Sequence, residues 1–219
     1  MARTIRIDFV ADVACPWCVV GIHSLLSTLA ALRDEVNPEL YLQPFELNPE
    51  LGPQGENVVD HAVKKYGTTR EEAEAGIKRA NDQAALYGFA LNQSSRSRVW
   101  NTRDAHRLLF WTGLDGNQMP LFHALYRANF TEQRSVSDHA VLLDLVGRVG
   151  LDVERARALL SSDEFASDVE SKEQSALQNG IIRVPTVVFD QRWTVQGAQT
   201  PQIYAQAMRD IISSEPLTQ

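Results

Sequence analysis

The chain has 219 residues, of which 44% are hydrophobic and 22% are charged, with a formal net charge of −7 and two cysteines. This length can bury a sizeable core without cross-links, and two cysteines exclude a disulfide-dense secreted scaffold. The acidic balance argues against nucleic acid as a partner, and no run of 18 apolar residues predicts a membrane span. Charges interrupt the N-terminal MARTIRIDFV, so we expect no signal peptide and a cytoplasmic protein.

The first 50 residues alternate between strand and helix patterns. Residues 4–10 alternate apolar and polar side chains, which predicts a strand. Residues 17–32 carry apolar side chains at helical spacing, and we expect Asn37-Pro38 to close this helix. Residues 39–47 alternate again, so the order strand, helix, strand predicts a βαβ unit with a parallel sheet.

The C-terminal 40 residues again show strand and helix patterns. Residues 186–189 and 193–196 have strand patterns separated by a turn-like tripeptide, which predicts a hairpin. A last helix is predicted from Pro201, a favourable first helical residue. Its apolar face is expected to consist of Ile203, Ala207 and Ile211.

Between these two regions lies a long helical segment. Residues 56–179 form a succession of helical stretches punctuated by glycine, which is too much chain for a loop. We therefore predict an α/β domain made of residues 1–55 and 180–219, interrupted by a helical insertion lobe of residues 56–179.

Both cysteines lie in one tetrapeptide, Cys15-Pro16-Trp17-Cys18, between the first strand and the first helix. A thiolate at the N-cap can accept hydrogen bonds from the next helical amides, here those of Trp17 and Cys18, and Pro16 loses nothing at the first helical position. The helix N-terminus thereby favours the thiolate of Cys15, which makes it the attacking thiol. Cys18 lies one turn further in, where we expect it to be more buried and to act as the resolving thiol.

Other interpretations of the two cysteines are weaker. A zinc site needs four ligands, and the five histidines are scattered without ligand spacing, so no metal is expected. A disulfide across two intervening residues closes too small a loop to stabilise the fold much. Two inert core cysteines remain an alternative, but they do not explain the proline between them at a helix start.

Further candidates lie elsewhere in the chain. Pro185 begins a strand: either it is an ordinary edge-strand proline, or it is cis and exposes the backbone of Val184 to a substrate opposite the dithiol. Asp12, three residues before Cys15, either relays protons to the dithiol or caps the following loop, and the alternative to both is a solvated loop carboxylate. Asn48 follows the second predicted strand, at the edge where parallel sheets bind ligands.

One helix of the predicted lobe has a polar face that includes Asn101 and His106. This face either overlooks Cys15 and contacts a bound peptide or glutathione, or belongs to an ordinary amphipathic helix with a solvated side.

Five segments of the chain together have a distinctive order and motif. They are residues 12–18, 44–49, 101–107, 184–185 and 196–199. In these segments the chain resembles the DsbA-like branch of the thioredoxin superfamily, and it is similar to the FrnE-type dithiol–disulfide oxidoreductases. This resemblance implies a thioredoxin-like fold with a large helical insertion, a cis Val184-Pro185 bond, and attack by Cys15.

The same branch contains kappa-class glutathione transferases and 2-hydroxychromene-2-carboxylate isomerases, which usually have serine at the first cysteine position. Resemblance to these proteins implies glutathione contacts at Ala198 and Gln199, just before the last helix. Some FrnE-type proteins carry a second cysteine pair near the C-terminus, which this chain lacks. Its reductant is therefore not assigned by resemblance.

The sequence thus predicts a protein disulfide oxidoreductase or isomerase that exchanges disulfides with a protein or a small thiol. The contacts expected to hold its substrate include Pro16, Trp17 and Val184. The alternative is a glutathione-dependent isomerase or transferase of an aromatic metabolite, and a third hypothesis is a non-catalytic binder. We expect no tightly bound cofactor, with glutathione as reductant or co-substrate. The sequence specifies neither the direction of electron flow nor the oligomeric state.

Overall fold

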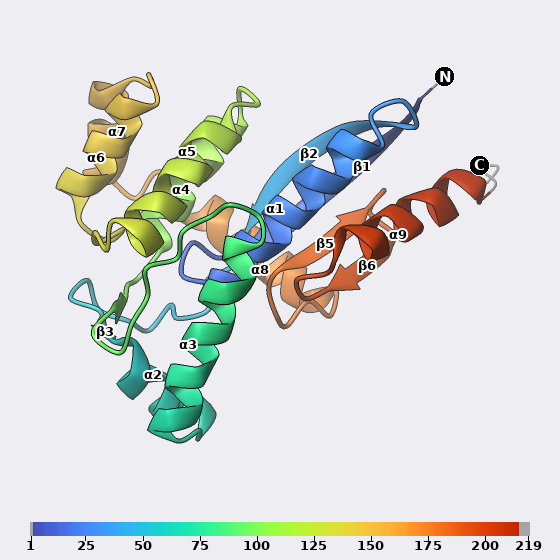
Figure 1. Ribbon diagram of the computed structural model, residues 1–219. Helices are drawn as coiled ribbons and strands as arrows, with labels where there is room; N and C mark the ends of the chain where they lie inside the picture. Colours follow the sequence, from blue (N-terminus) through green and yellow to red (C-terminus); the bar gives the residue numbers. More distant parts are fainter. Residues whose placement is uncertain (1, 215–219) are drawn as a thin grey trace.

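A computed structural model describes residues 2–214 and shows a four-stranded mixed sheet in the order β2-β1-β5-β6 (Figure 1). The central strand β1 pairs in parallel with β2 and antiparallel with β5, and β5 pairs antiparallel with β6. The predicted βαβ unit and C-terminal hairpin are confirmed. Their bounds are β1 Arg3–Ala11, α1 Pro16–Ala31, β2 Val36–Pro44, β5 Thr186–Phe189, β6 Trp193–Gln196 and α9 Pro201–Ser213.

Strand β2 differs from its predicted bounds. Helix α1 ends at Ala31, so Pro38 does not close it and lies inside the strand instead. Proline is tolerated here because β2 is an edge strand. Backbone groups alternate sides along a strand, so those of Pro38 point the same way as those of Leu42, away from β1. The strand ends at Pro44, so residues 45–47 belong to the loop that follows.

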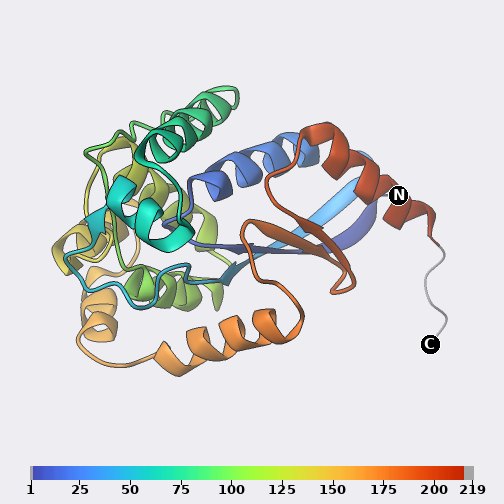
Figure 2. The same ribbon diagram turned by 90° about the horizontal axis from the view of Figure 1, so that it is seen from below.

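Helices cover both faces of the sheet (Figure 2). Helices α1 and α9 pack together on one face, where α9 buries Tyr204, Met208 and Ile211. The helix is therefore as predicted, but its buried face is rotated, since Ile203 is exposed while the larger Tyr204 is buried. Helices α4 and α8 lie on the other face, against β2.

The predicted helical segment contains seven α-helices among the described residues, together with two features that the sequence did not predict. One is a two-residue ladder between β3 and β4, and the other is the single π-helical turn η1. The bounds are β3 Glu56–Asn57, α2 Val58–Tyr66, α3 Arg70–Ala85, β4 Arg98–Val99, α4 Arg103–Gly113, α5 Gln118–Tyr126, η1 Arg127–Thr131, α6 His139–Arg148, α7 Val153–Leu160 and α8 Ala166–Gln178.

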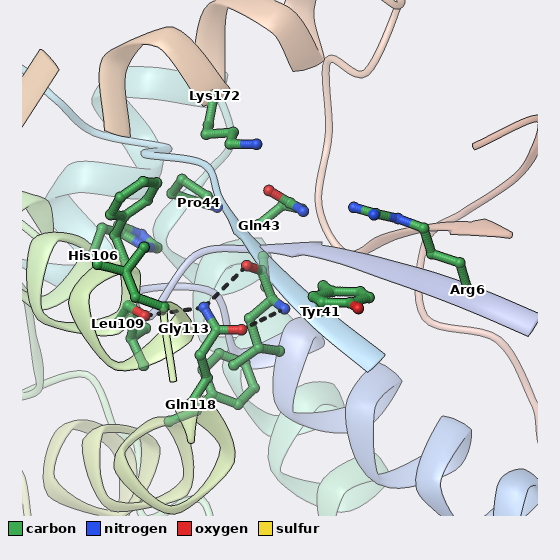
Figure 3. Close-up of a pocket in the computed structure, with 14 residues that line it drawn as sticks. Arg6, Tyr41, Gln43, Pro44, His106, Leu109, Gly113, Gln118 and Lys172 are labelled. Carbon is green, nitrogen blue, oxygen red and sulfur yellow. Dashed lines mark hydrogen bonds between the residues drawn. The ribbon is translucent and has the colours of Figure 1, made fainter. Parts of the chain in front are cut away.

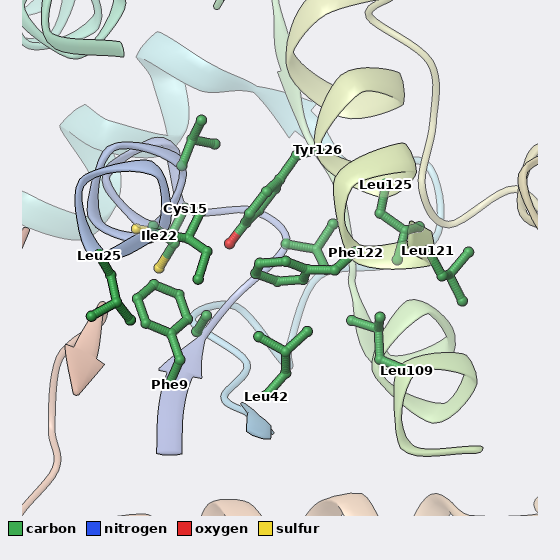
Figure 4. Close-up of a cluster of buried hydrophobic side chains, with 14 of the residues drawn as sticks. Phe9, Cys15, Ile22, Leu25, Leu42, Leu109, Leu121, Phe122, Leu125 and Tyr126 are labelled. Atoms are coloured by element: carbon green, nitrogen blue, oxygen red, sulfur yellow. The ribbon is translucent and has the colours of Figure 1, made fainter. Parts of the chain in front are cut away.

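The insertion helices and the sheet share one continuous hydrophobic cluster (Figure 4). Phe9 of β1 meets Phe122 of α5 edge to face, with ring centroids 6.4 Å apart, and Phe122 contacts Tyr126 at 4.3 Å. All three rings are at most 1% exposed. This shared packing fixes the insertion helices relative to the start of α1, where the cysteines lie.

A side chain completes the free edge of β2 (Figure 3). The Gln118 carboxamide, at the start of α5, accepts a hydrogen bond from the Leu42 amide at 3.0 Å and donates to the Leu42 carbonyl at 3.3 Å. The same nitrogen donates to the Leu109 carbonyl at 3.0 Å, which links α4 to this contact. Among the helices of residues 2–214, none is long and apolar enough to cross a membrane.

Candidate functional site

The two cysteines lie at the N-terminus of α1, as predicted. Cys15 is the N-cap residue with extended backbone angles, and Pro16 takes the first helical position. The amide of Cys15 donates to the carbonyl of Asp12 at 3.0 Å, and the amide of Cys18 donates to the carbonyl of Cys15 at 3.1 Å. These bonds fold the segment into a tight turn that presents Cys15 ahead of the helix.

The hydrogen bonds expected from the helix amides to the Cys15 sulfur are absent from the described structure. Both cysteines are free thiols, and the Cys15 Sγ–H donates to the carbonyl of Val184 at 3.7 Å. A neutral thiol is a weak donor, so it turns toward a carbonyl rather than toward N–H groups. Cys15 is 4% exposed and Cys18 is fully buried, in the predicted order. Burial, followed by the hydrogen bond with Cys15, raises the pKa of the Cys18 thiol well above its ordinary value.

The loop before β5 closes over the dithiol. The Val184-Pro185 peptide bond is cis, as the family resemblance implies. The Pro185 ring packs against α1 at Gly21, where a Cβ atom would come within 2.8 Å of the ring. The Pro185 carbonyl accepts a hydrogen bond from the amide of Gly197 at 2.8 Å, which ties the loop to the end of β6. Gly21 was not recognised in the sequence, because only the fold shows what approaches it.

A cleft of about 740 Å³ opens beside Cys15, between the start of α1, the Val184 loop and the helices of the insertion. Five of the residues predicted to form the site line this cleft: Cys15, Pro16, Trp17, Asn48 and Val184.

Asn48 is held from the insertion side. Its Oδ1 accepts a hydrogen bond from Lys65 Nζ at 2.7 Å and lies 2.9 Å from Nε2 of His61, both on α2. The loop after β2 is thereby joined to the opposite wall of the cleft.

Four residues that were predicted to contact the substrate lie outside this cleft: Asn101, His106, Ala198 and Gln199. Ala198 and Gln199 precede α9 and do not line the cleft; the Gln199 carbonyl accepts a hydrogen bond from Ser24 Oγ at 2.7 Å. Asn101 also lies outside it, with its Nδ2 donating to the Pro49 carbonyl at 3.4 Å and its Oδ1 capping the start of α4.

Asp12 is fully buried behind the dithiol and is not a solvated loop carboxylate. Its oxygens accept hydrogen bonds from the amides of Ala14 at 3.0 Å and Leu47 at 2.6 Å, and from the Thr102 hydroxyl at 2.8 Å. His106 Nε2 lies 3.3 Å from the same carboxylate and is itself only 2% exposed. This carboxylate joins the cysteine loop, the loop after β2 and helix α4.

Asp12 and His106 shift each other's pKa in the directions that keep both side chains charged. Burial by itself raises the pKa of Asp12, but the hydrogen bond and charge of His106 and the two amides outweigh it, so the pKa is lowered. Burial by itself lowers the pKa of His106, but Asp12 outweighs it, so the pKa is raised. Both directions favour an aspartate–imidazolium ion pair.

Glu46 is a site residue that the sequence reasoning did not single out. It lines the cleft, and burial raises the pKa of its carboxyl to about 7. Its Oε2 is buried without a hydrogen-bond partner among the described residues, and its amide donates to Glu173 Oε1 at 2.7 Å. Within residues 2–214, no three acidic, histidine or cysteine side chains come together to hold a metal ion.

Comparison with known proteins identifies the family to which this fold belongs. The model of the DSBA-like thioredoxin domain family matches residues 6–209. A probable DsbA oxidoreductase from Streptomyces coelicolor shares 35% sequence identity and a TM-score of 0.90, over 98% of this chain and 93% of that one. No match is found among curated protein sequences.

More distant solved structures share the fold alone. A 2-hydroxychromene-2-carboxylate isomerase is 17% identical, with a TM-score of 0.73 over 94% of this chain and 95% of that one. The cytosolic disulfide reductase DsbM from Pseudomonas aeruginosa, solved with GSH, is 15% identical, with a TM-score of 0.61 over 95% of this chain and all of that one. The predicted α/β fold with a helical insertion is confirmed, and the chain belongs to the DSBA-like thioredoxin domain family.

Proposed function

We propose that this protein is a thiol–disulfide oxidoreductase in which Cys15 attacks and Cys18 resolves. The observation that carries the proposal is the pair of free thiols at the start of α1, with Cys15 lining an open cleft and Cys18 buried behind it. Membership of the DSBA-like family supports it.

In the reductive direction, the Cys15 thiolate attacks one sulfur of a substrate disulfide. The substrate S–S bond breaks, the leaving sulfur takes up a proton, and a mixed disulfide forms on Cys15. Cys18 then loses its proton and attacks the Cys15 sulfur, which releases the second substrate thiol and leaves a Cys15–Cys18 disulfide. The substrate gains two electrons and the dithiol loses two. Two molecules of an external thiol such as glutathione then reduce the Cys15–Cys18 disulfide and leave as one disulfide. In the oxidative direction the same steps run in reverse.

The residues around the dithiol have separable proposed roles. Trp17 and Pro16 form the wall next to the attacking sulfur, and the Val184 backbone offers strand-like hydrogen bonds to a substrate chain. Asp12 and His106 do not line this cleft; they are proposed as positioning residues that hold the cysteine loop against α4.

Two serine variants test the mechanism. Cys15→Ser should abolish the reduction of insulin disulfides with dithiothreitol as reductant. Cys18→Ser should accumulate a mixed disulfide on Cys15, visible by mass spectrometry and reversed by excess dithiothreitol. Turnover retained in Cys15→Ser would overturn the proposal.

A second candidate is a glutathione-dependent isomerase or transferase of an aromatic metabolite. The apolar walls of the cleft favour it, in particular the exposed rings of Trp17 and Tyr66. An enzyme of this kind needs no resolving thiol, so Cys18→Ser should leave its activity intact while it stops disulfide turnover.

A cytosolic setting is part of the leading proposal, as in the Pseudomonas aeruginosa disulfide reductase, which is described as cytosolic.

A further inference from the structure

The cleft beside Cys15 gathers exposed apolar surface. Trp17, Tyr66, Leu177 and Ile182 all line it, and they are 38%, 65%, 51% and 66% exposed. They come from α1, α2, α8 and the loop before β5, so the apolar surface surrounds the cleft. Exposed apolar side chains grouped around one opening mark an interaction site.

The same cleft is lined by unpaired cations. Its basic residues are Lys65, Arg79, Arg98 and Arg183, and none of them forms an ion pair with a carboxylate among residues 2–214. Lys65 and Arg98 donate to neutral oxygens of the loops after β2. For Arg79 and Arg183 the described residues supply no side-chain hydrogen bond, and both residues are exposed.

The charge of the cleft is opposite to that of the whole chain. The chain has a formal net charge of −7, whereas the lining has four cations and one carboxyl, Glu46. A cleft of one sign attracts ligands of the other sign and raises their association rate.

We propose that the cleft selects a protein substrate whose disulfide lies in an extended segment that combines apolar side chains with carboxylates. This proposal rests on the proposed oxidoreductase function and specifies its substrate. The apolar walls would take the hydrophobic side chains, and Arg79 and Arg183 would pair with the carboxylates.

A peptide segment fits the cleft better than a small disulfide. The cations Arg79 and Arg183 come from α3 and from the loop before β5, so a ligand must span from one wall to the other to meet both. Beside Cys15, the amide of Val184 has no backbone partner among the described residues and can pair with an extended chain.

The test compares three substrates with dithiothreitol as reductant. Two cyclic disulfide peptides have the same length and the same apolar residues, and they carry either two glutamates or two lysines at matched positions. The third substrate is glutathione disulfide. For the unmodified protein we expect kcat/KM to be at least about tenfold higher for the acidic peptide than for the basic one, with the ratio falling as salt is raised.

Charge-reversal variants locate the effect. Arg79→Glu combined with Arg183→Glu should bring the acidic-to-basic ratio of kcat/KM to about one or below. Arg192→Glu makes the matched control: Arg192 is an exposed cation on the β5–β6 turn, outside the cleft and without an ion pair among the described residues. Its variant should keep the ratio within about twofold of the unmodified protein. Urea unfolding of each variant checks that it is folded.

The outcomes separate the two proposals. Equal kcat/KM for the acidic and basic peptides would overturn the substrate class and leave the oxidoreductase function standing. No turnover of any disulfide would overturn the function itself. A higher kcat/KM for glutathione disulfide than for the acidic peptide would replace the peptide by a small anionic disulfide.

Discussion

Replacing Gly21 by alanine should destabilise the protein, although alanine is the better helix former. In the interior of α1, alanine is favoured over glycine by about 1 kcal/mol. The added Cβ would lie 2.8 Å from Cγ and 3.3 Å from Cβ of Pro185, and 3.6 Å from the Phe9 ring. A prolyl ring has no rotamer with which to move aside, and overpacking of this kind costs about 1–3 kcal/mol. We expect a net loss of up to about 2 kcal/mol in the free energy of unfolding.

Gly76→Ala provides the matched control. Gly76 lies in α3, which like α1 has 16 residues, and outside the helix's own backbone its added Cβ would meet only Arg79 Nη2, at 3.6 Å, the far end of a flexible side chain. This substitution should therefore stabilise the protein by about 0.5–1 kcal/mol. Equilibrium urea unfolding of both variants measures the contrast, and the two shifts should have opposite signs. If Gly21→Ala stabilises the protein as much as Gly76→Ala does, the loop before β5 is not held by this contact.

Two further predictions concern the buried charges. Glu46 has a folded-state pKa of about 7 against an ordinary 4.5, so the protein should lose stability as pH rises from 4.5 to 7. Glu46→Gln should reduce this loss, measured as the difference in thermal unfolding temperature between pH 5 and pH 8. Substitution of the exposed Glu50 by Gln should leave that difference unchanged. Asp12→Asn should cost about 3–5 kcal/mol, because it leaves His106 without its buried counter-charge. The lowered pKa of Asp12 and the raised pKa of His106 place the largest cost between about pH 4 and 6.5, since the Asp12 contribution is lost toward acid and that of His106 toward base. Equal urea midpoints for Asp12→Asn and the unmodified protein in this window would contradict the ion pair.

The sequence predicted those parts of the fold and site that short segments determine. The alternation in β1 and the proline at the start of α1 act within a few residues, and both were placed correctly. The burial of Asp12 could not be predicted, because its partner His106 is 94 residues away and reaches it only through the packing of α4.

The same reasoning explains the corrections. Pro38 is compatible with a strand only at an outward-facing edge position, and which strand lies at the edge depends on the whole sheet. The raised pKa of Glu46 depends on how the insertion covers the loop after β2. The separation of Ala198 and Gln199 from the cleft likewise follows from the way α9 packs along α1.

The Gln118 contact bears on self-association. An open strand edge can recruit a strand from another copy of the chain and so begin aggregation. On β2, the side chain of Gln118 forms hydrogen bonds with both outward-facing backbone groups of Leu42. Pro38 faces outward on the same edge and has no N–H to donate. One amide side chain and one proline thus leave this edge with fewer open hydrogen-bonding groups, which makes it a poorer template for a strand of a second molecule, while the cleft stays open to the strands of its substrates.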